Sequence, residues 1–316
     1  MGGNKVEFSK ELFEPLSSEE KKIEQIARPS VTYWQDAWRR LKGNKVALIS
    51  LVVIVIITLL AIFVPSFSKF DYANNDLNSA NLKPSGTHWF GTDQLGRDVF
   101  VRCMYGARYS MIIAFVSVVI NIVIGIIYGG ISGYFGGRID NIMMRIVDIL
   151  YAIPTTIIVV LLMTVLSKPG EAGGSDLTSI IIALAVTYWL NMARIVRGEI
   201  LQLKNQEFVL AAKTLGASGS RIIFRHLIPN AMGSIIVTMT LLIPSAIFTE
   251  AFLSFIGLGI SAPKASLGTL ASDAMGAIYL FPYQLFFPSL MICLIILAFN
   301  LFGDGLSDAL DPKMRK

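Results

Sequence analysis

Two carboxylates inside apolar stretches, Asp148 and Glu250, are suited by type and position to binding or proton chemistry. An ionisable group in a membrane span costs about 2.5–3.5 kcal/mol, so both should face protein or water. Asp148 follows Arg145 by about one helical turn, which favours a local ion pair. Glu250 has no basic residue within ten positions, which favours a carboxylate hydrogen-bonded to backbone at a helix break. The alternative for both is a place in a translocation path, with Glu250 near its outer gate.

Other catalytic chemistry is poorly supported. The sequence contains no Gly-Lys dipeptide and therefore no phosphate-binding G-x-x-x-x-G-K-[ST] loop. It also contains no H-E-x-x-H zinc helix and no G-x-S-x-G nucleophile turn. His88 and His226 are expected to have structural or interfacial roles, and the two cysteines lie too far apart in sequence to indicate a metal site or a disulfide. We expect no catalytic residue, no cofactor and no metal.

A polar and basic island at 207–230, EFVLAAKTLGASGSRIIFRHLIPN, separates two apolar runs. Helix formers fill 208–215, Gly216 suits the left-handed position after a helix, and Ser218 suits an N-cap. The pattern predicts a helix, a sharp turn and a second helix that ends before Pro229. Its small alanines leave a surface that a partner can approach closely. The alternative is an ordinary basic loop of a membrane protein.

The island resembles the EAA loop of ABC-importer permeases, in which two alanines, a glycine and a proline follow at fixed spacing. Ala211, Ala212, Gly216 and Pro229 match that spacing, while Leu210 replaces the usual glutamate and His226 the usual isoleucine. Such departures are expected in the branch that imports oligopeptides, dipeptides and nickel. The resemblance implies a docking surface for an ATPase subunit, formed by Glu207, Ala211, Ala212, Lys213, Leu215, Gly216 and Pro229.

The composition is that of an integral membrane protein. Hydrophobic residues make up 54% of the 316-residue chain and charged residues 16%, with a positive mean hydropathy. The net charge of +5 does not indicate nucleic acid, because the basic residues flank apolar runs. We expect no cleavable signal sequence, since the first long apolar run follows a long charged segment.

Six apolar runs approach the roughly 20 residues needed to cross a bilayer as a helix. They lie at 46–65, 109–137, 149–166, 177–193, 227–249 and 284–303, the fifth interrupted near Pro244 and closed by Glu250. The chain thus divides into a tail (1–32), an interfacial helix (33–45), the first transmembrane helix (46–65), an extracytoplasmic segment (66–108), a permease domain (109–303) and a second tail (304–316). The extracytoplasmic segment is expected to contain a short amphipathic helix near 95–106, and 252–268 a re-entrant or surface segment.

Basic residues set the orientation. Of the 27 Lys and Arg residues, 20 fall on the side that holds both termini and the island. The positive-inside rule places that side in the cytoplasm. The predicted fold is an all-α membrane protein with six transmembrane helices, cytoplasmic N- and C-termini, and a cytoplasmic coupling-helix loop between spans four and five.

The resemblance covers nearly all of the chain beyond residue 30. It implies a permease subunit of an ATP-driven peptide importer in a bacterial or archaeal cell (inner) membrane. The implied partners are a second similar permease, two ATP-binding subunits, an extracytoplasmic peptide-binding protein and membrane lipid, but no nucleic acid. Nickel or another small solute is an alternative cargo. A self-sufficient secondary carrier is a less favoured alternative, because the spans carry few central charges and no evident repeat.

Overall fold

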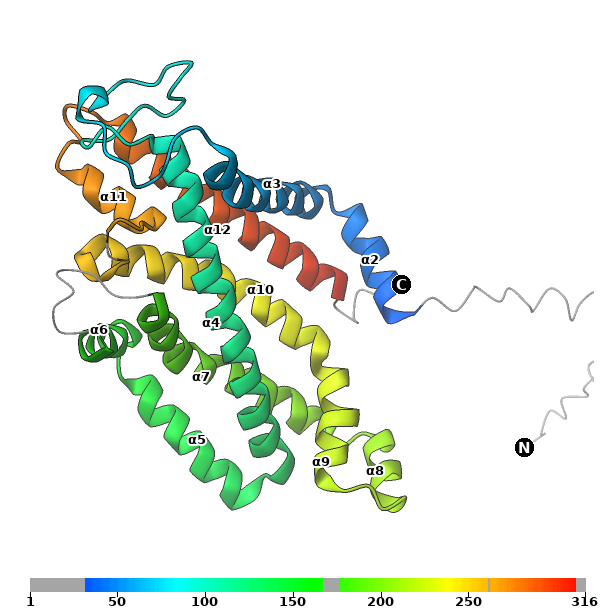
Figure 1. Ribbon diagram of the computed structural model, residues 1–316. Coiled ribbons are helices and arrows are strands. Elements are labelled where there is room, and N and C mark those ends of the chain that lie inside the picture. Colours follow the sequence, from blue (N-terminus) through cyan, green and yellow to red (C-terminus); the bar gives the residue numbers. More distant parts are fainter. Residues whose placement is uncertain (1–31, 167–176, 261, 311–316) are drawn as a thin grey trace, which may run out of the picture.

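The computed structural model describes residues 32–166, 177–260 and 262–310, and these residues are largely helical (Figure 1). The helices are α2 (Tyr33–Gly43), α3 (Lys45–Phe67), a 3₁₀ turn (Leu77–Ser79), α4 (Val99–Phe135), α5 (Gly137–Ala152), α6 (Thr155–Leu166), α7 (Leu177–Leu203), α8 (Glu207–Thr214), α9 (Gly219–Ile222), a π turn (Ile223–Leu227), α10 (Ile228–Leu253), a second π turn (Ser254–Leu258), α11 (Leu267–Met275) and α12 (Tyr283–Leu310). The predicted tails at 1–32 and 304–316 lie outside the described residues, except for residue 32 and residues 304–310.

Several of these helices are long and apolar enough to cross a membrane. Within the described ranges they are α3, α4, α7, the continuous helix Gly219–Leu258 that contains α10, and α12. α5 and α6 form one further apolar pair, bent by 84° at their junction. The prediction of an all-helical, multi-pass membrane protein is confirmed, with six spans if the bent pair counts as one.

The prediction of an unbroken span at 149–166 is wrong. α5 ends at Ala152 and α6 begins at Thr155. Pro154 has no backbone N–H to donate, and its ring disfavours helical dihedrals in the residue before it. Ile153 is accordingly extended, with φ −84° and ψ 127°. One proline thus turns a predicted straight span into two helices at a steep angle.

The separate short helix predicted near 95–106 is also wrong, because these residues begin the second span. The Oδ1 atom of Asp98 accepts a hydrogen bond of 2.8 Å from the backbone N–H of Val101 and so caps α4. From Val99 the helix continues without a break to Phe135. Its first turns are buried although they contain Arg102. Hydropathy located only the part of this helix that is free of charge.

Three other helices extend beyond their predicted spans. α7 continues to Leu203 and α12 to Leu310, well into polar sequence. Pro244 lies inside α10 without ending it, and Glu250 is inside the helix rather than at its end. Backbone hydrogen bonds continue a helix wherever the sequence permits, whereas an apolar run marks only the stretch that suits lipid.

α4 and α7 lie side by side in the middle of the fold (Figure 1). Gly125, Gly129 and Gly133 of α4 recur every four residues and face α7. A methyl group added at Gly129 would lie 2.4 Å from the carbonyl oxygen of Ala193. The helix backbones therefore approach closely because these positions carry no side chain, as the glycines of this span predict.

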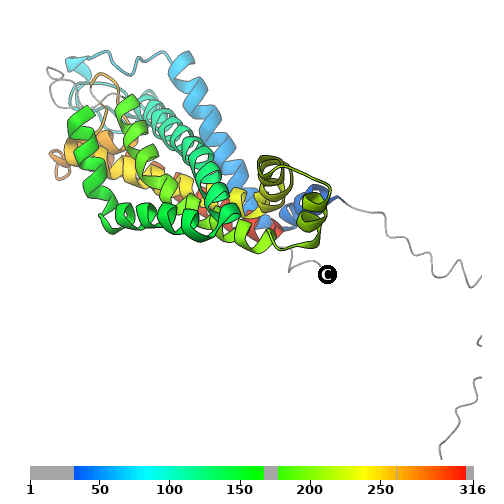
Figure 2. The same ribbon diagram turned by 90° about the horizontal axis from the view of Figure 1, so that it is seen from below.

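The two ends of the bundle carry different elements (Figure 2). α2, α8, α9 and the end of α12 gather at one end, where the Tyr33 hydroxyl donates to the Leu310 carbonyl oxygen at 3.0 Å. The segment 68–98 and α11 lie at the opposite end. The fold therefore separates the two sides that the predicted topology requires, while the choice of the cytoplasmic end remains a prediction.

α2 matches the helical part of the segment predicted to be interfacial, 33–45. Ala37 and Leu41 are buried, with Leu41 packed beside Ala309 of α12. Trp34 and Trp38 from the same predicted face are 54% and 50% exposed. The aromatic pair is therefore available to the headgroup region of a membrane, where Trp is favoured.

Candidate docking surface and transport residues

The predicted turn of the island is present as a Schellman motif at the end of α8. The backbone N–H of Ala217 donates to the carbonyl oxygen of Ala212, and that of Gly216 to Lys213, both at 3.0 Å. Gly216 has φ +81°, the left-handed conformation that glycine adopts without strain. The Ser218 hydroxyl then accepts from the Arg221 N–H as the N-cap of α9. The helix–turn–helix shape is confirmed.

The end predicted for the second helix is wrong, because the chain continues helically through Pro229. α9 passes through the π turn 223–227 directly into α10. The N–H of Ile228 bonds to the carbonyl oxygen of Ile223, five residues back. Pro229 sits in the first turn of α10. The wider π turn just before it is where the regular helical hydrogen-bond ladder changes, which accommodates a residue that lacks a donor.

Most of the predicted docking residues are exposed to solvent, namely Glu207, Ala211, Lys213, Leu215, Gly216 and Pro229. Leu215, at the turn, is 87% exposed. Ala212 is different, since it faces inward and is 8% exposed within the main core. The turn therefore presents a small apolar surface, with Ala212 among the residues that support it.

Tyr134, near the end of α4, packs against the island. A methyl group added at Gly219 would lie 3.0 Å from the ring of Tyr134. The Lys213 ammonium lies 5.7 Å from the centre of the same ring. The island is thus attached to the long helix that reaches the other end of the bundle. No sequence pattern indicated this contact.

The predicted ion pair of Asp148 with Arg145 is wrong. Asp148 instead accepts from Arg194 of α7, with 2.7 Å between its Oδ1 and the Arg194 Nη2. The Arg194 guanidinium also lies 4.1 Å from the centre of the Tyr151 ring. Both charged side chains remain partly exposed, so this pair joins α5 to α7 at the surface.

A second carboxylate, Asp140, has a more buried pairing that sequence reasoning missed. Its two oxygens accept from Nε and Nη2 of Arg197 at 2.5 and 2.6 Å, a bidentate arrangement. The Ser132 hydroxyl donates to the same carboxylate at 2.6 Å. These residues join α4, α5 and α7. They lie up to 65 residues apart in sequence, so no local pattern announces them.

Glu250 is enclosed among α4, α10 and the start of α11. Its two carboxylate oxygens accept hydrogen bonds of 2.7 Å, one from Ser110 and one from Ser254. The Ser266 hydroxyl donates in turn to that of Ser254 at 3.0 Å. The side chain is fully buried in this subunit. The partners are therefore side-chain hydroxyls rather than backbone at a helix break.

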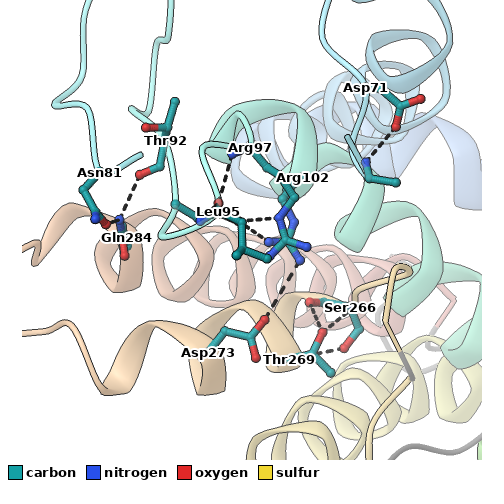
Figure 3. A network of polar contacts seen from close by, with 12 residues as sticks. Asp71, Asn81, Thr92, Leu95, Arg97, Arg102, Ser266, Thr269, Asp273 and Gln284 are labelled. Atoms are coloured by element: carbon teal, nitrogen blue, oxygen red, sulfur yellow. Dashed lines mark hydrogen bonds and ion pairs between the residues drawn. The ribbon is translucent and has the colours of Figure 1, made fainter. Parts of the chain in front are cut away.

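At the opposite end of the bundle from the island, the segment 68–98 meets α4, α11 and α12 through polar contacts (Figure 3). Oδ1 of Asp93 accepts from the backbone N–H groups of Leu95 and Arg97, both at 2.9 Å. Oδ2 accepts from Arg97 Nε at 2.8 Å and also from Arg102. Burial raises the pKa of Asp93, but Arg102 and Arg97 outweigh it and hold the pKa of this carboxyl below its usual range.

His88 and Gln284 also tie this region together. Nδ1 of His88 lies 2.8 Å from an Asp98 carboxylate oxygen, in keeping with the structural role predicted for this histidine. Nε2 of Gln284 donates to the Thr92 carbonyl oxygen at 2.8 Å and to Asn81 at 2.9 Å. Among the described residues, no group of three or more His, Cys, Asp or Glu side chains has the arrangement of a metal site.

Comparison with known proteins identifies the family. Residues 121–316 match the family described as binding-protein-dependent transport system inner membrane component. Residues 32–84 match the N-terminal TM domain of oligopeptide transport permease C.

Similar proteins extend over nearly all of the chain. It is 54% identical to the oligopeptide transport system permease protein OppC of Bacillus subtilis, over 97% of this chain and 98% of that protein. It is 51% identical to the dipeptide transport system permease protein DppC of the same organism, over 94% and 91%. A chain of the MetNI methionine ABC transporter in an inward-facing conformation has a similar fold, with TM-score 0.54 and 19% identity over 66% of this chain and 96% of that one. This chain therefore belongs to the family of inner membrane components of binding-protein-dependent transport systems, and it is a multi-pass membrane permease.

Proposed function

We propose that this permease forms half of the translocation pore of an ATP-driven ABC importer whose cargo is oligopeptides or dipeptides. The observation that carries the proposal is the identity of 54% and 51%, over nearly the whole chain, to permeases named for oligopeptide and dipeptide transport. Both named relatives favour peptides over nickel as the cargo. The fold resemblance to a chain of an ABC transporter favours a pore subunit over a self-sufficient carrier.

The proposed complex contains a second, similar permease, two cytoplasmic ATP-binding subunits and an extracytoplasmic binding protein that delivers the peptide. ATP hydrolysis belongs to the partner subunits, since this sequence lacks a G-x-x-x-x-G-K-[ST] loop. Many apolar side chains on α3, α5 and α6 are exposed in this subunit. Their exposure supports lipid and a second permease as neighbours. The proposed location is a bacterial or archaeal cell membrane with the island in the cytoplasm.

The island is the proposed seat of an ATP-binding subunit. Leu215 and Gly216 at the turn, with Ala211 and Lys213 on α8, supply the direct contacts, and Glu207 and Pro229 flank them. Ala212 acts from beneath, because its side chain packs into the core. Movement of the ATPase would reach the bundle through α9 and α10, which form one continuous helix with the π turn between them.

Glu250 and Asp148 are proposed to affect the path in different ways. Glu250 is enclosed, so it acts through the packing of α4, α10 and α11 at the predicted outer side rather than by direct contact with cargo. Asp148 is half exposed and paired with Arg194, so it is the one of the two with access to solvent.

Reconstitution tests the proposal. The chain would be assembled in liposomes with the permease, ATP-binding and binding-protein subunits encoded beside it. Labelled di- and oligopeptides should accumulate only with ATP and the binding protein. Uptake of Ni²⁺ but not peptide, or peptide uptake by this chain alone along an ion gradient, would contradict it.

A further inference from the structure

A cavity of about 540 Å³ lies at the end of the bundle opposite the island, within the size range of small-ligand sites. It is lined by the loop 93–97, the start of α4, the segment after α10, α11 and α12. Its charged lining residues are Asp93, Arg97, Arg102, Lys264 and Asp273. Three of these charges are positive and two negative. The cavity has no role in the docking of an ATPase and belongs to the predicted extracytoplasmic side.

Asp93 orients two guanidinium groups at this cavity and is itself saturated. Both of its oxygens are used, one by two backbone N–H groups and the other by Arg97 Nε and Arg102. It holds the arginines in place but has no acceptor to spare. The side chains of Arg97 and Arg102 are only 10% and 5% exposed. Most of each side chain is therefore buried against protein.

The remaining donors of the two arginines are poorly satisfied. Arg97 contacts Asp93 only through Nε, and its two terminal nitrogens have no hydrogen-bond partner in the described part of the chain. Nε of Arg102 is buried without a partner. Nη2 of Arg102 lies 4.0 Å from Asp273, beyond hydrogen-bond distance. Leaving the buried Nε of Arg102 without an acceptor is costly, and the terminal nitrogens of Arg97 have donors to offer, so the site favours an incoming group with several acceptor oxygens.

The surrounding chemistry narrows the class of that group. A planar carboxylate suits the fork of donors on a guanidinium. Lys264, exposed at the rim, adds a further positive charge. Asp273 makes the site unfavourable for a dianion such as phosphate, and its carboxylate suits a ligand that also carries a positive charge. Gln94 offers a partner for an amide group.

We propose that this cavity is a transient binding site for the free C-terminal carboxylate of the imported peptide, held by Arg97, Arg102 and Lys264 as the peptide enters from the binding protein. The inference rests on the proposed function and adds the chemistry by which this subunit recognises the cargo. Arg102 gives the site its fixed charge, Arg97 supplies free terminal donors, and Lys264 attracts the carboxylate at the rim.

The test compares trialanine with its C-terminal amide, which lacks the carboxylate charge. Initial ATP-dependent uptake is measured in proteoliposomes with the same binding protein, and the ratio of acid to amide uptake is compared between variants. Arg97→Gln should lower that ratio about tenfold, as for loss of a charge-assisted hydrogen bond. Lys264→Gln, at an exposed position, should lower it about twofold. Lys83→Gln is the matched control, because this exposed lysine lies in the same polar segment but outside the cavity lining.

The possible outcomes distinguish failure of this inference from failure of the proposed function on which it rests. If wild type imports neither peptide, the proposed function fails and the inference with it. If wild type imports peptide but the acid-to-amide ratio is unchanged in Arg97→Gln and Lys264→Gln, the inference alone is overturned. An equal loss for both peptides also overturns it, and indicates a carboxylate on the binding protein instead. Because Lys264 is exposed, its variant gives a result even if Arg97→Gln does not fold.

Discussion

Gly129→Ala tests whether close contact of α4 and α7 holds the bundle together. The added methyl group would lie 2.4 Å from the Ala193 carbonyl oxygen and 2.9 Å from Cβ of Val196, where ordinary contact begins near 3.4 Å. The helices must therefore separate by about 1 Å, and overpacking of this kind costs about 1–3 kcal/mol. Alanine regains about 0.5–1 kcal/mol of helix propensity. The net effect should be a loss of about 1 kcal/mol in the free energy of unfolding, within a range of about 0–2.5 kcal/mol.

Gly130→Ala is the matched control, one residue along the same helix. Its methyl group would meet Ile223 at 3.5 Å, an ordinary contact, so only the gain in propensity remains. Both variants would be purified in detergent and unfolded with increasing denaturant, with wild type beside them. Gly129→Ala should unfold first and Gly130→Ala should equal or exceed wild type. Equal stability of the two variants would refute the close-packing argument.

Three further predictions concern the polar contacts and the island. Gly216→Ala should destabilise the turn by about 1–2 kcal/mol through its left-handed φ alone, since nothing lies within 4 Å; amide exchange across the turn would show this, and unchanged protection would contradict it. Arg197→Ala should cost about 1–3 kcal/mol by leaving the buried Asp140 without its cationic partner, against about 0–1 kcal/mol for Arg194→Ala, whose partner Asp148 is more exposed. Thermal unfolding of both variants checks this, and a larger loss of stability for Arg194→Ala would contradict it. Glu250→Gln should lower peptide uptake but leave the subunits assembled on gel filtration, and full uptake would remove this residue from the transport mechanism.

Local chemistry explains what the sequence predicted well. Gly216 and Ser218 act on their own neighbours, so a turn signal and a cap signal were sufficient for the shape of the island. Apolar runs located the membrane helices for the same reason, since each run meets lipid along its own length. The glycines of α4 were likewise informative, because glycine in a membrane helix commonly permits the close approach of a second helix.

Pairing between distant residues explains what the sequence did not predict. Asp148 has Arg145 one turn away, but the fold brings Arg194 to it instead. Glu250 has no local partner, and only the packing of α4 against α10 supplies Ser110. Pro229 and Pro154 show the limit of a local rule, since one lies within a helix beside a π turn and the other ends a helix. Whether a proline ends a helix depends on whether neighbouring groups can replace the backbone hydrogen bond that it cannot donate.

We propose that this permease receives its driving force through the turn of the island, and crosslinking tests this proposal most directly. Leu215→Cys would be made in a Cys293→Ser background, where the remaining Cys103 is buried. Leu77→Cys, 72% exposed at the other end of the bundle, is the control. In the assembled complex, a short thiol crosslinker should join residue 215, but not residue 77, to an ATP-binding subunit. A crosslink from position 77, or none from position 215 in an active complex, would contradict the account.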